Sequence, residues 1–134
     1  MSKYHYIKIT SDNRIEVVHQ DSPDLSVAVL ELAVGGDFDI TWACPRLPFD
    51  ENLRLIINEE GEKRNLPLNC LGTVICGNPI YGDIVLGTQT LPDEDSEIII
   101  YAFPEDEYNS LFALLNNTLK LNAGFRWVEK EVAA

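Results

Sequence analysis

The stretch that decides the fold runs from Leu53 to Asn69 and reads LRLIINEEGEKRNLPLN. It begins with a run of apolar residues, interrupted only by Arg54, that predicts a buried strand. The polar turn that follows ends at Gly61, where we expect a positive φ, which glycine adopts without strain. The stretch then enters a segment in which Pro67 suits the first turn of a helix. It therefore predicts a domain that combines strands with helices.

The segments before this stretch predict a hairpin, a helix and a third strand. Residues 3–10 and 14–18 are rich in β-branched and aromatic side chains, so we expect them to pair as a hairpin. Ser22 is expected to cap the helix that follows, with a proline in its first turn, and Gly35 is expected to end it. Polar and apolar residues alternate again over 37–44, which predicts the third strand.

The segments after the stretch predict two more strands and a long helix. Residues 83–87 follow a Gly-Asp turn and are mostly apolar. Residues 97–103 form the clearest strand, and their continuous apolar run indicates a central place in the sheet. Pro104 opens a helix whose apolar side chains recur at helical spacing from Tyr108 to Leu119. Residues 125–132 are expected to form an edge strand or a peripheral tail.

Together these elements predict an α+β fold, with a mixed or antiparallel sheet of about five to seven short strands and two or three helices. At 134 residues the chain is long enough to bury a core of its own. Hydrophobic residues make up 46% of the sequence, which argues against a disordered chain. We expect a single domain over residues 1–122 and a C-terminal edge strand or tail over 123–134.

The sequence contains no pattern typical of export or membrane insertion. No apolar run approaches the roughly 18 residues that indicate a membrane-spanning helix, and the N-terminus lacks the apolar core of a signal peptide. We therefore expect a cytoplasmic protein. The odd number of cysteines then predicts reduced thiols that serve as small apolar core residues, namely Cys44, Cys70 and Cys76.

Four short motifs, in this order along the chain, carry a resemblance to a known family. They are Val34-Gly35-Gly36, Asn58-Glu59-Glu60-Gly61, Leu66-Pro67-Leu68-Asn69, and Gly82-Asp83-Ile84 leading to Gly87. Over residues 25–103 the chain resembles the DUF3846 family, whose members occur mainly in bacteriophages and mobile elements. It departs from that family at Cys70, where members usually have a basic residue. It also departs from Tyr108 onward, where no counterpart is recognised.

The resemblance implies a small accessory protein of a phage or mobile element that acts in the host cell. Some proteins similar to this family inhibit type II CRISPR nucleases, so the resemblance also implies an anti-CRISPR-like inhibitor of a host defence nuclease. The positions that the resemblance marks are the motif residues themselves, namely Asn58, Glu59, Glu60, Gly61, Leu66, Pro67, Leu68 and Asn69.

The net charge of −12 bears on function independently of the resemblance. It argues against direct binding to nucleic acid, which needs clustered Lys and Arg. It permits a protein partner with a basic surface, such as the nucleic-acid channel of a nuclease. The candidate partner-binding residues come from a run that no Lys or Arg interrupts, namely Asp93, Glu94, Asp95, Glu97, Glu105, Asp106 and Glu107.

These acids form two groups, at opposite ends of the strand expected over 97–103. A strand of that length places the groups about 20 Å apart. As a functional site, they would offer carboxylates to Arg and Lys of a partner and imitate a track of phosphates. As ordinary structure, they are a polar loop and an acidic helix start.

Two other functions stay open. One is a small-ligand module, in which Asn58–Gly61 and Asn69 line a pocket for a nucleotide-like molecule, with Lys63 and Arg64 as the nearest cations. The same polar residues also suit a structural turn that Asn69 bonds from the next helix. The other is an oligomeric structural or regulatory protein that associates through residues 125–132.

No pattern in the sequence indicates catalysis, a cofactor or a metal. His5 and His19 are the only histidines, and we expect them at the surface or at strand ends, with no nucleophile motif nearby. Acids such as Asp37, Asp39 and Asp83 do not have the spacing of a known cation-binding loop. We therefore expect a protein that is not an enzyme and that needs neither cofactor nor metal.

Overall fold

The structure is a computed structural model that describes residues 3–41, 49, 52–89, 100–119 and 126–131. The described residues form one sheet of seven strands and three helices, which is the single α+β domain that the sequence predicts. The elements, in chain order, are β1 (Tyr4–Ile9), β2 (Arg14–Gln20), α1 (Val27–Val34), β3 (Phe38–Thr41), β4 (Leu53–Asn58), α2 (Cys70–Cys76), β5 (Ile84–Thr88), β6 (Phe103–Pro104), α3 (Glu105–Leu119) and β7 (Arg126–Glu131).

The sheet is mixed, and its strands do not follow the order of the chain. The order across the sheet is β3-β4-β5-β1-β2-β7, and β6 pairs with β1 outside this path. Neighbouring strands are antiparallel, except that β2 and β7 are parallel. β3 and β7 are therefore the edge strands of the described sheet, and β5 and β1 lie in its middle.

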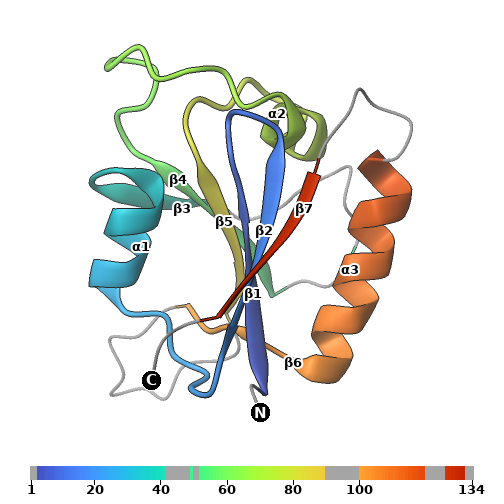
Figure 1. Cartoon of the computed structure of the whole chain (residues 1–134). Helices are drawn as coiled ribbons and strands as arrows, with labels where there is room; N and C mark the ends of the chain where they lie inside the picture. The colour runs from blue at the N-terminus through green and yellow to red at the C-terminus, as the bar shows by residue number, and fades with distance from the viewer. Residues whose placement is uncertain (1–2, 42–48, 50–51, 90–99, 120–125, 132–134) are drawn as a thin grey trace.

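The helices cover the sheet from both sides (Figure 1). α1 packs on β3, β4 and β5, while α2 and α3 lie on the opposite face, where α3 contacts β1 and β6. Each side has its own buried cluster. Leu55 and Leu111 belong to the cluster under α2 and α3, and Leu30 and Ile56 belong to the cluster under α1. The two helical layers thus bury both faces of the central strands.

β4 is the buried strand that the stretch from Leu53 predicts. Leu53 and Leu55 pack into the cluster under α2 and α3, whereas Ile56 packs under α1. The alternation follows from the pleat of the strand, which sends successive side chains to opposite faces. Because both faces are covered, the apolar run of β4 is nearly continuous in the sequence.

The β1–β2 hairpin forms as predicted, but the first helix begins later than expected. Its N-cap is Ser26, whose side chain accepts a backbone N–H in the first turn, and not Ser22. The residues before Ser26 stay extended because their backbone groups bond to residues 100–102. The helix ends at Gly35 as predicted, with the left-handed φ of 84° that favours glycine there.

The turn after β4 and the start of α2 also differ from the prediction. Gly61 does not adopt a positive φ. Glycine is needed here for a steric reason instead, because a Cβ atom at this position would lie only 2.7 Å from the carbonyl oxygen of Tyr81. Pro67 precedes the helix rather than starting it, since α2 begins directly after its N-cap, Asn69. The proline segment pairs with Tyr81 through an isolated bridge and is therefore not free to become helical.

The sequence predicts a central strand over residues 97–103. The structure describes this segment from Ile100 onward, and there the backbone does not take a central place in the sheet. Tyr101 makes only isolated bridges, and the strand is reduced to the two residues of β6. The central places belong to β5 and β1. The apolar run of this segment is continuous because Ile100 is buried under α1 and Phe103 is buried under α3.

β7 shows that the C-terminal segment is an edge strand, one of the two predicted alternatives. It pairs in parallel with β2. Trp127 of β7 packs on Phe112 of α3, with ring centroids 4.3 Å apart, and its Nε1 donates to Asn116 Oδ1 at 3.4 Å. The indole ring therefore joins β7 to α3 within the chain.

Candidate functional site

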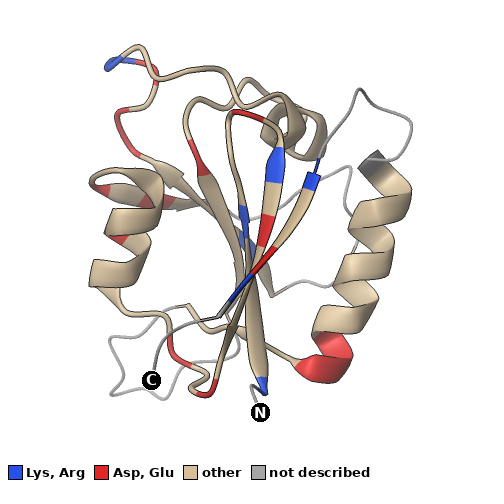
Figure 2. Cartoon of the chain, in the orientation of Figure 1, with Lys and Arg blue, Asp and Glu red and all other residues tan. Residues whose placement is uncertain are grey.

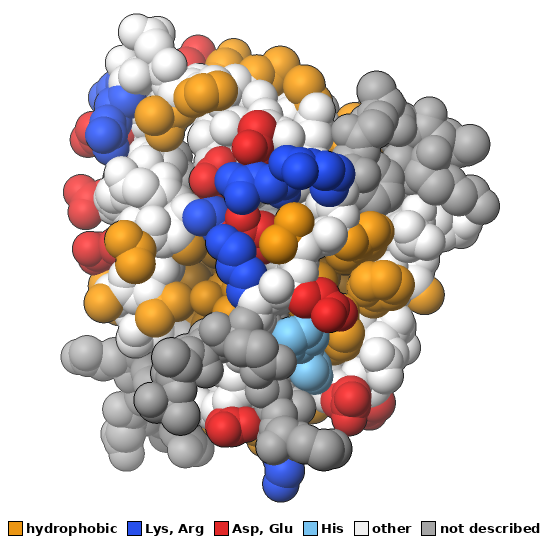
Figure 3. Space-filling view, viewed as in Figure 1, with side chains coloured by type: hydrophobic (Ala, Val, Ile, Leu, Met, Phe, Trp, Pro, Cys, Tyr) orange, Lys and Arg blue, Asp and Glu red, His pale blue; other side chains and the backbone are white. Residues whose placement is uncertain are grey.

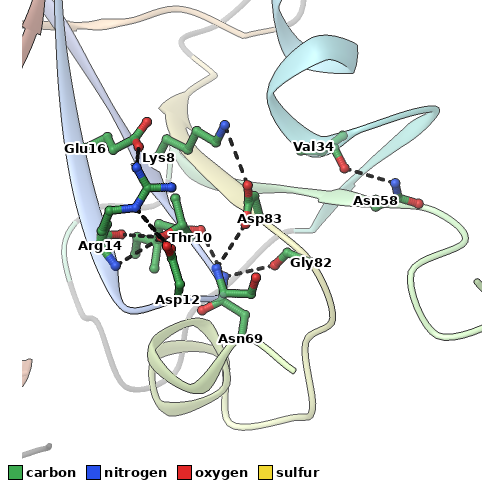
Figure 4. Close-up of polar contacts among 12 residues, drawn as sticks. Lys8, Thr10, Asp12, Arg14, Glu16, Val34, Asn58, Asn69, Gly82 and Asp83 are labelled. Carbon is green, nitrogen blue, oxygen red and sulfur yellow. Dashed lines mark hydrogen bonds and ion pairs between the residues drawn. The ribbon is translucent and has the colours of Figure 1, made fainter. Parts of the chain in front are cut away.

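Asn69 holds three segments together at the end of β1 (Figure 4). Its side chain is fully buried, and its Nδ2 donates to the carbonyl oxygens of Ile9 and Gly82, both at 2.9 Å. Its Oδ1 accepts the N–H of Gly72 at 2.8 Å and so caps α2. The side chain thus bonds β1 and the turn that leads into β5, and not the 58–61 turn that the sequence suggested.

Asn58 ties the end of β4 to the end of α1 (Figure 4). Its Nδ2 donates to the carbonyl oxygen of Val34 at 3.0 Å, and its Oδ1 accepts the N–H of Glu60 at 2.8 Å. Arg64 makes a similar link from the other end of the turn, because its Nη1 donates to the carbonyl oxygen of Gly35 at 3.1 Å. These polar side chains form hydrogen bonds with backbone groups. They therefore have the structural role that the sequence suggested as the alternative to a ligand site.

Two pockets lie beside the motifs. The first, of about 160 Å³, is lined by Asn58, Glu59 and Gly61 among others, and it is smaller than ligand pockets usually are. The second, of about 290 Å³, opens between α1 and the end of β1. It gathers residues of the other three motifs, namely Val34 and Gly35, Leu66 and Pro67, and Gly82 and Asp83. Segments far apart in the sequence therefore meet at one place on the surface.

A network of ion pairs lies over β1, β2 and β7, and Figure 4 shows the contacts made by Lys8, Arg14 and Glu16. The carboxylate of Glu16, whose side chain is 4% exposed, is at its centre, 3.0 Å from Arg14 Nη1 and 3.1 Å from Lys130 Nζ. Beside it, Lys8 Nζ lies 3.6 Å from the carboxylate of Asp83. Three of the chain's cations are thus paired within the sheet itself.

Hydrogen bonds hold the pKa of Asp12 below its ordinary value. The largest cause is the hydroxyl of Thr10, which donates to the Asp12 carboxylate, and the second is Arg14, whose Nε donates at 3.1 Å. The same contact with Asp12 raises the pKa of Arg14. The two residues flank the tip of the β1–β2 hairpin, so this pair stabilises the turn.

The described structure contains part of the acidic patch predicted from the sequence. Four of its members lie outside the described residues, namely Asp93, Glu94, Asp95 and Glu97. The other three, Glu105, Asp106 and Glu107, form the first turn of α3, as predicted. The side chains of Glu105 and Asp106 are exposed and make no ion pair with a described residue. Figure 2 shows this turn as an acidic patch at one end of α3.

The two histidines form a pair that the sequence analysis missed. His5 is only 5% exposed, and its Nδ1 lies 2.7 Å from Nδ1 of His19, its partner across the hairpin. The ring of His5 also stacks on Tyr108 of α3, with centroids 4.6 Å apart. Burial, and after it the charge of Glu129, raises the pKa of Tyr108. The expectation of a surface position is wrong for His5, although His5 does lie near the end of a strand, as the second residue of β1. The hairpin register is the signal that places the two rings together.

Few groups in the described structure suit other chemistry. Within it, no three His, Cys, Asp or Glu side chains gather where they could hold a metal ion. Cys70 and Cys76 are free thiols, while Cys44 lies outside the described residues. Cys70 is exposed and not a core residue as expected, because it takes the solvent side of the first turn of α2. None of the described helices is long and apolar enough to cross a membrane.

Comparisons of the chain with protein-family models, with curated proteins and with solved structures found no match. The function is therefore argued from the surface of this chain.

Proposed function

We propose that this chain is an acidic protein-interaction module that binds a partner with a basic surface. The observation that carries the proposal is the segregation of charge. Lys8, Arg14 and Lys130 pair with carboxylates on the sheet. Many exposed acids make no ion pair with a described residue, namely Asp21, Asp24, Glu31, Asp37, Asp39, Glu59, Glu60, Glu62, Glu105 and Asp106.

This segregation directs negative charge outward. Lys and Arg gather over β1, β2 and β7, whereas acids mark the start of α3 and the surroundings of α1 (Figures 2 and 3). With a net charge of −12, the chain attracts proteins of opposite charge and speeds their association. The same charge repels the phosphates of nucleic acids and nucleotides.

The partner that fits this surface best is a host defence nuclease, and the chain acts as its phage-encoded or mobile-element inhibitor. The DNA channel of an RNA-guided nuclease is positively charged because it holds phosphates. Carboxylates bind Arg and Lys through the same charge-assisted hydrogen bonds as phosphates do. α3 presents three consecutive acids on a rigid element. The resemblance to the DUF3846 family supports the same role.

The test is DNA cleavage by a purified type II CRISPR nuclease with its guide RNA, measured at increasing concentrations of the chain. We expect the unsubstituted chain to inhibit cleavage and to do so less well at high salt, because exposed charge pairs are screened. The variant Glu105→Gln, Asp106→Asn, Glu107→Gln should inhibit about tenfold more weakly, since it removes the exposed carboxylates of Glu105 and Asp106 and the half-buried one of Glu107.

A matched control separates the site from the total charge. Glu59→Gln, Glu60→Gln, Glu62→Gln removes the same number of charges from the turn after β4 and should inhibit nearly as well as the unsubstituted chain. Equal weakening by both variants would show that the acids of α3 are not more important than acids elsewhere on the surface. Inhibition that neither variant changes would contradict the acidic-surface mechanism, and no inhibition by the unsubstituted chain would contradict the nuclease as target.

A further inference from the structure

α1 is apolar on its solvent side as well as on its buried side. Its sequence is VAVLELAV, and only Leu30 and Val34 are buried. Val27 is 56% exposed and Leu32 is 84% exposed. A helix that is apolar all round is normally covered all round. Of the four large apolar side chains that the described residues leave exposed, three belong to α1, and the fourth is Leu68.

The exposed apolar residues of α1 form one continuous surface. Helical spacing places position 28 one turn before position 32, with position 29 beside them, while position 27 lies next to position 28 at the first residue of the helix and is separated from position 32 by Glu31. A pocket of about 290 Å³ opens next to Leu32 and is also lined by Leu66 and Pro67. An apolar area with a pocket at its edge is typical of the central part of a protein interface. We call the surface formed by Val27, Ala28, Val29 and Leu32 the α1 surface.

The charges around the α1 surface are almost all negative. Residues 15–45 contain neither Lys nor Arg. The exposed acids before, within and after α1 are Asp21, Asp24, Glu31, Asp37 and Asp39. The exceptions are Arg64, whose guanidinium bonds the carbonyl oxygen of Gly35 at the end of the helix, its neighbour Lys63, and Lys8, which lines the pocket beside Leu32 and is paired with Asp83. On the left of Figure 3, acidic side chains lie beside apolar ones along this margin of the molecule.

We infer that the α1 surface docks a basic amphipathic segment of a protein partner, an inference that rests on the proposed function and adds a second contact to the acids at the start of α3. Such a segment presents apolar side chains to the helix and Lys or Arg to the acidic rim. A second copy of the chain does not fit, because a symmetric contact through α1 would place each acidic rim against the same rim of the other copy. A membrane surface rich in anionic lipids is repelled by the rim for the same reason.

The test uses the full chain and three labelled synthetic peptides of equal length. One is an amphipathic helix of Leu and Lys, the second has the same Lys residues with Ser in place of Leu, and the third has Leu with Glu. We expect only the Leu/Lys peptide to bind tightly. The double variant Val27→Ser, Leu32→Ser should weaken this binding about tenfold or more, because it removes the apolar anchors.

Leu68→Ser is the matched control, since it removes an exposed apolar side chain outside α1 and should leave the affinity within about twofold. Both variants change exposed side chains, so thermal unfolding should confirm that they remain folded. Three results would each overturn the inference. The Leu/Lys peptide could fail to bind, the Lys/Ser peptide could bind equally well, or the α1 variant could bind the Leu/Lys peptide as tightly as the unsubstituted chain does.

The same variants separate this inference from the proposed function in the cleavage assay. If the unsubstituted chain inhibits the nuclease and the α1 variant inhibits equally well, the function stands and the assignment of the α1 surface is overturned. If the chain does not inhibit the nuclease but binds the Leu/Lys peptide through α1, the docking surface stands and the target is wrong.

Discussion

The buried amide of Asn69 joins three parts of the chain that are distant in sequence. Asn69→Ala removes the cap of α2 and leaves the carbonyl oxygens of Ile9 and Gly82 without their donor. We expect the free energy of unfolding to fall by about 3 kcal/mol, the sum of a lost cap and unsatisfied buried acceptors. Urea unfolding measures this loss. Asn109→Ala, at an exposed position of α3, is the control and should cost less than about 0.5 kcal/mol. Similar losses in the two variants would contradict the role of Asn69.

The hydroxyl of Thr10 has a measurable electrostatic effect on Asp12. Because the pKa of Asp12 is lowered in the folded chain, its ionised form contributes stability above the unfolded pKa. That contribution is lost as the pH falls through the folded pKa, below about pH 4. Thr10→Val removes the largest cause of the shift, so the pKa of Asp12 should rise toward its ordinary value. A carboxyl titration followed by NMR tests this, and an unchanged pKa in the variant would assign the shift to Arg14.

At the scale of elements, the sequence predicted what depends on local chemistry. The β1–β2 hairpin, β4, β5 and α3 all follow from periodicity and turn residues. Ser22 was predicted to cap α1, but the cap is Ser26, because the backbone before Ser26 bonds to residues 100–102 and no local pattern indicates that pairing. Pro67 failed as a helix start for a similar reason, because its segment pairs with Tyr81.

The candidate site was predictable only in part. The acids at the start of α3 were predicted because the first turn of a helix favours them. The exposure of the α1 surface was not predicted, since VAVLELAV contains a single polar residue, Glu31, and its pattern does not indicate which side of the helix is exposed. The pairing of His5 with His19 depends on the hairpin register. Burial of a particular side is decided by tertiary packing and cannot be read from such a helix alone.

β7 is expected to stabilise the domain rather than to join copies of it. Deleting residues 124–134 would remove the partner of β2, and Glu16 would lose the ammonium group of Lys130. We expect the free energy of unfolding to fall by about 2 kcal/mol or more, and the shortened chain to associate through its newly exposed edge strand. Urea unfolding and light scattering measure both effects. If β7 joined copies of the chain, light scattering would instead show an oligomer for the full chain and a monomer after the deletion. That result would contradict this prediction.

At the scale of the whole molecule, the distribution of charge matters more than its sum. A net charge of −12 alone would serve solubility. Here Arg14 and Lys130 are paired with the buried carboxylate of Glu16, and Lys8 is paired with Asp83, while the exposed acids near α1 and at the start of α3 face outward. An apolar helix beside acids that make no ion pair with a described residue gives a partner both an anchor and a complementary charge. Association should therefore be sensitive to salt and to the loss of either feature.

The proposed function requires that the chain binds a basic protein through its exposed acids. The measurement that tests this requirement most directly is affinity capture from bacterial lysate at low and at high salt, with bound proteins identified by mass spectrometry. The unsubstituted chain is compared with the Glu105→Gln, Asp106→Asn, Glu107→Gln variant. We expect the unsubstituted chain to retain a basic, nucleic-acid-binding protein that elutes as the salt concentration rises, and the variant to retain much less of it. Equal capture by both chains at both salt concentrations, or no specific capture at either, would contradict an acidic interaction surface.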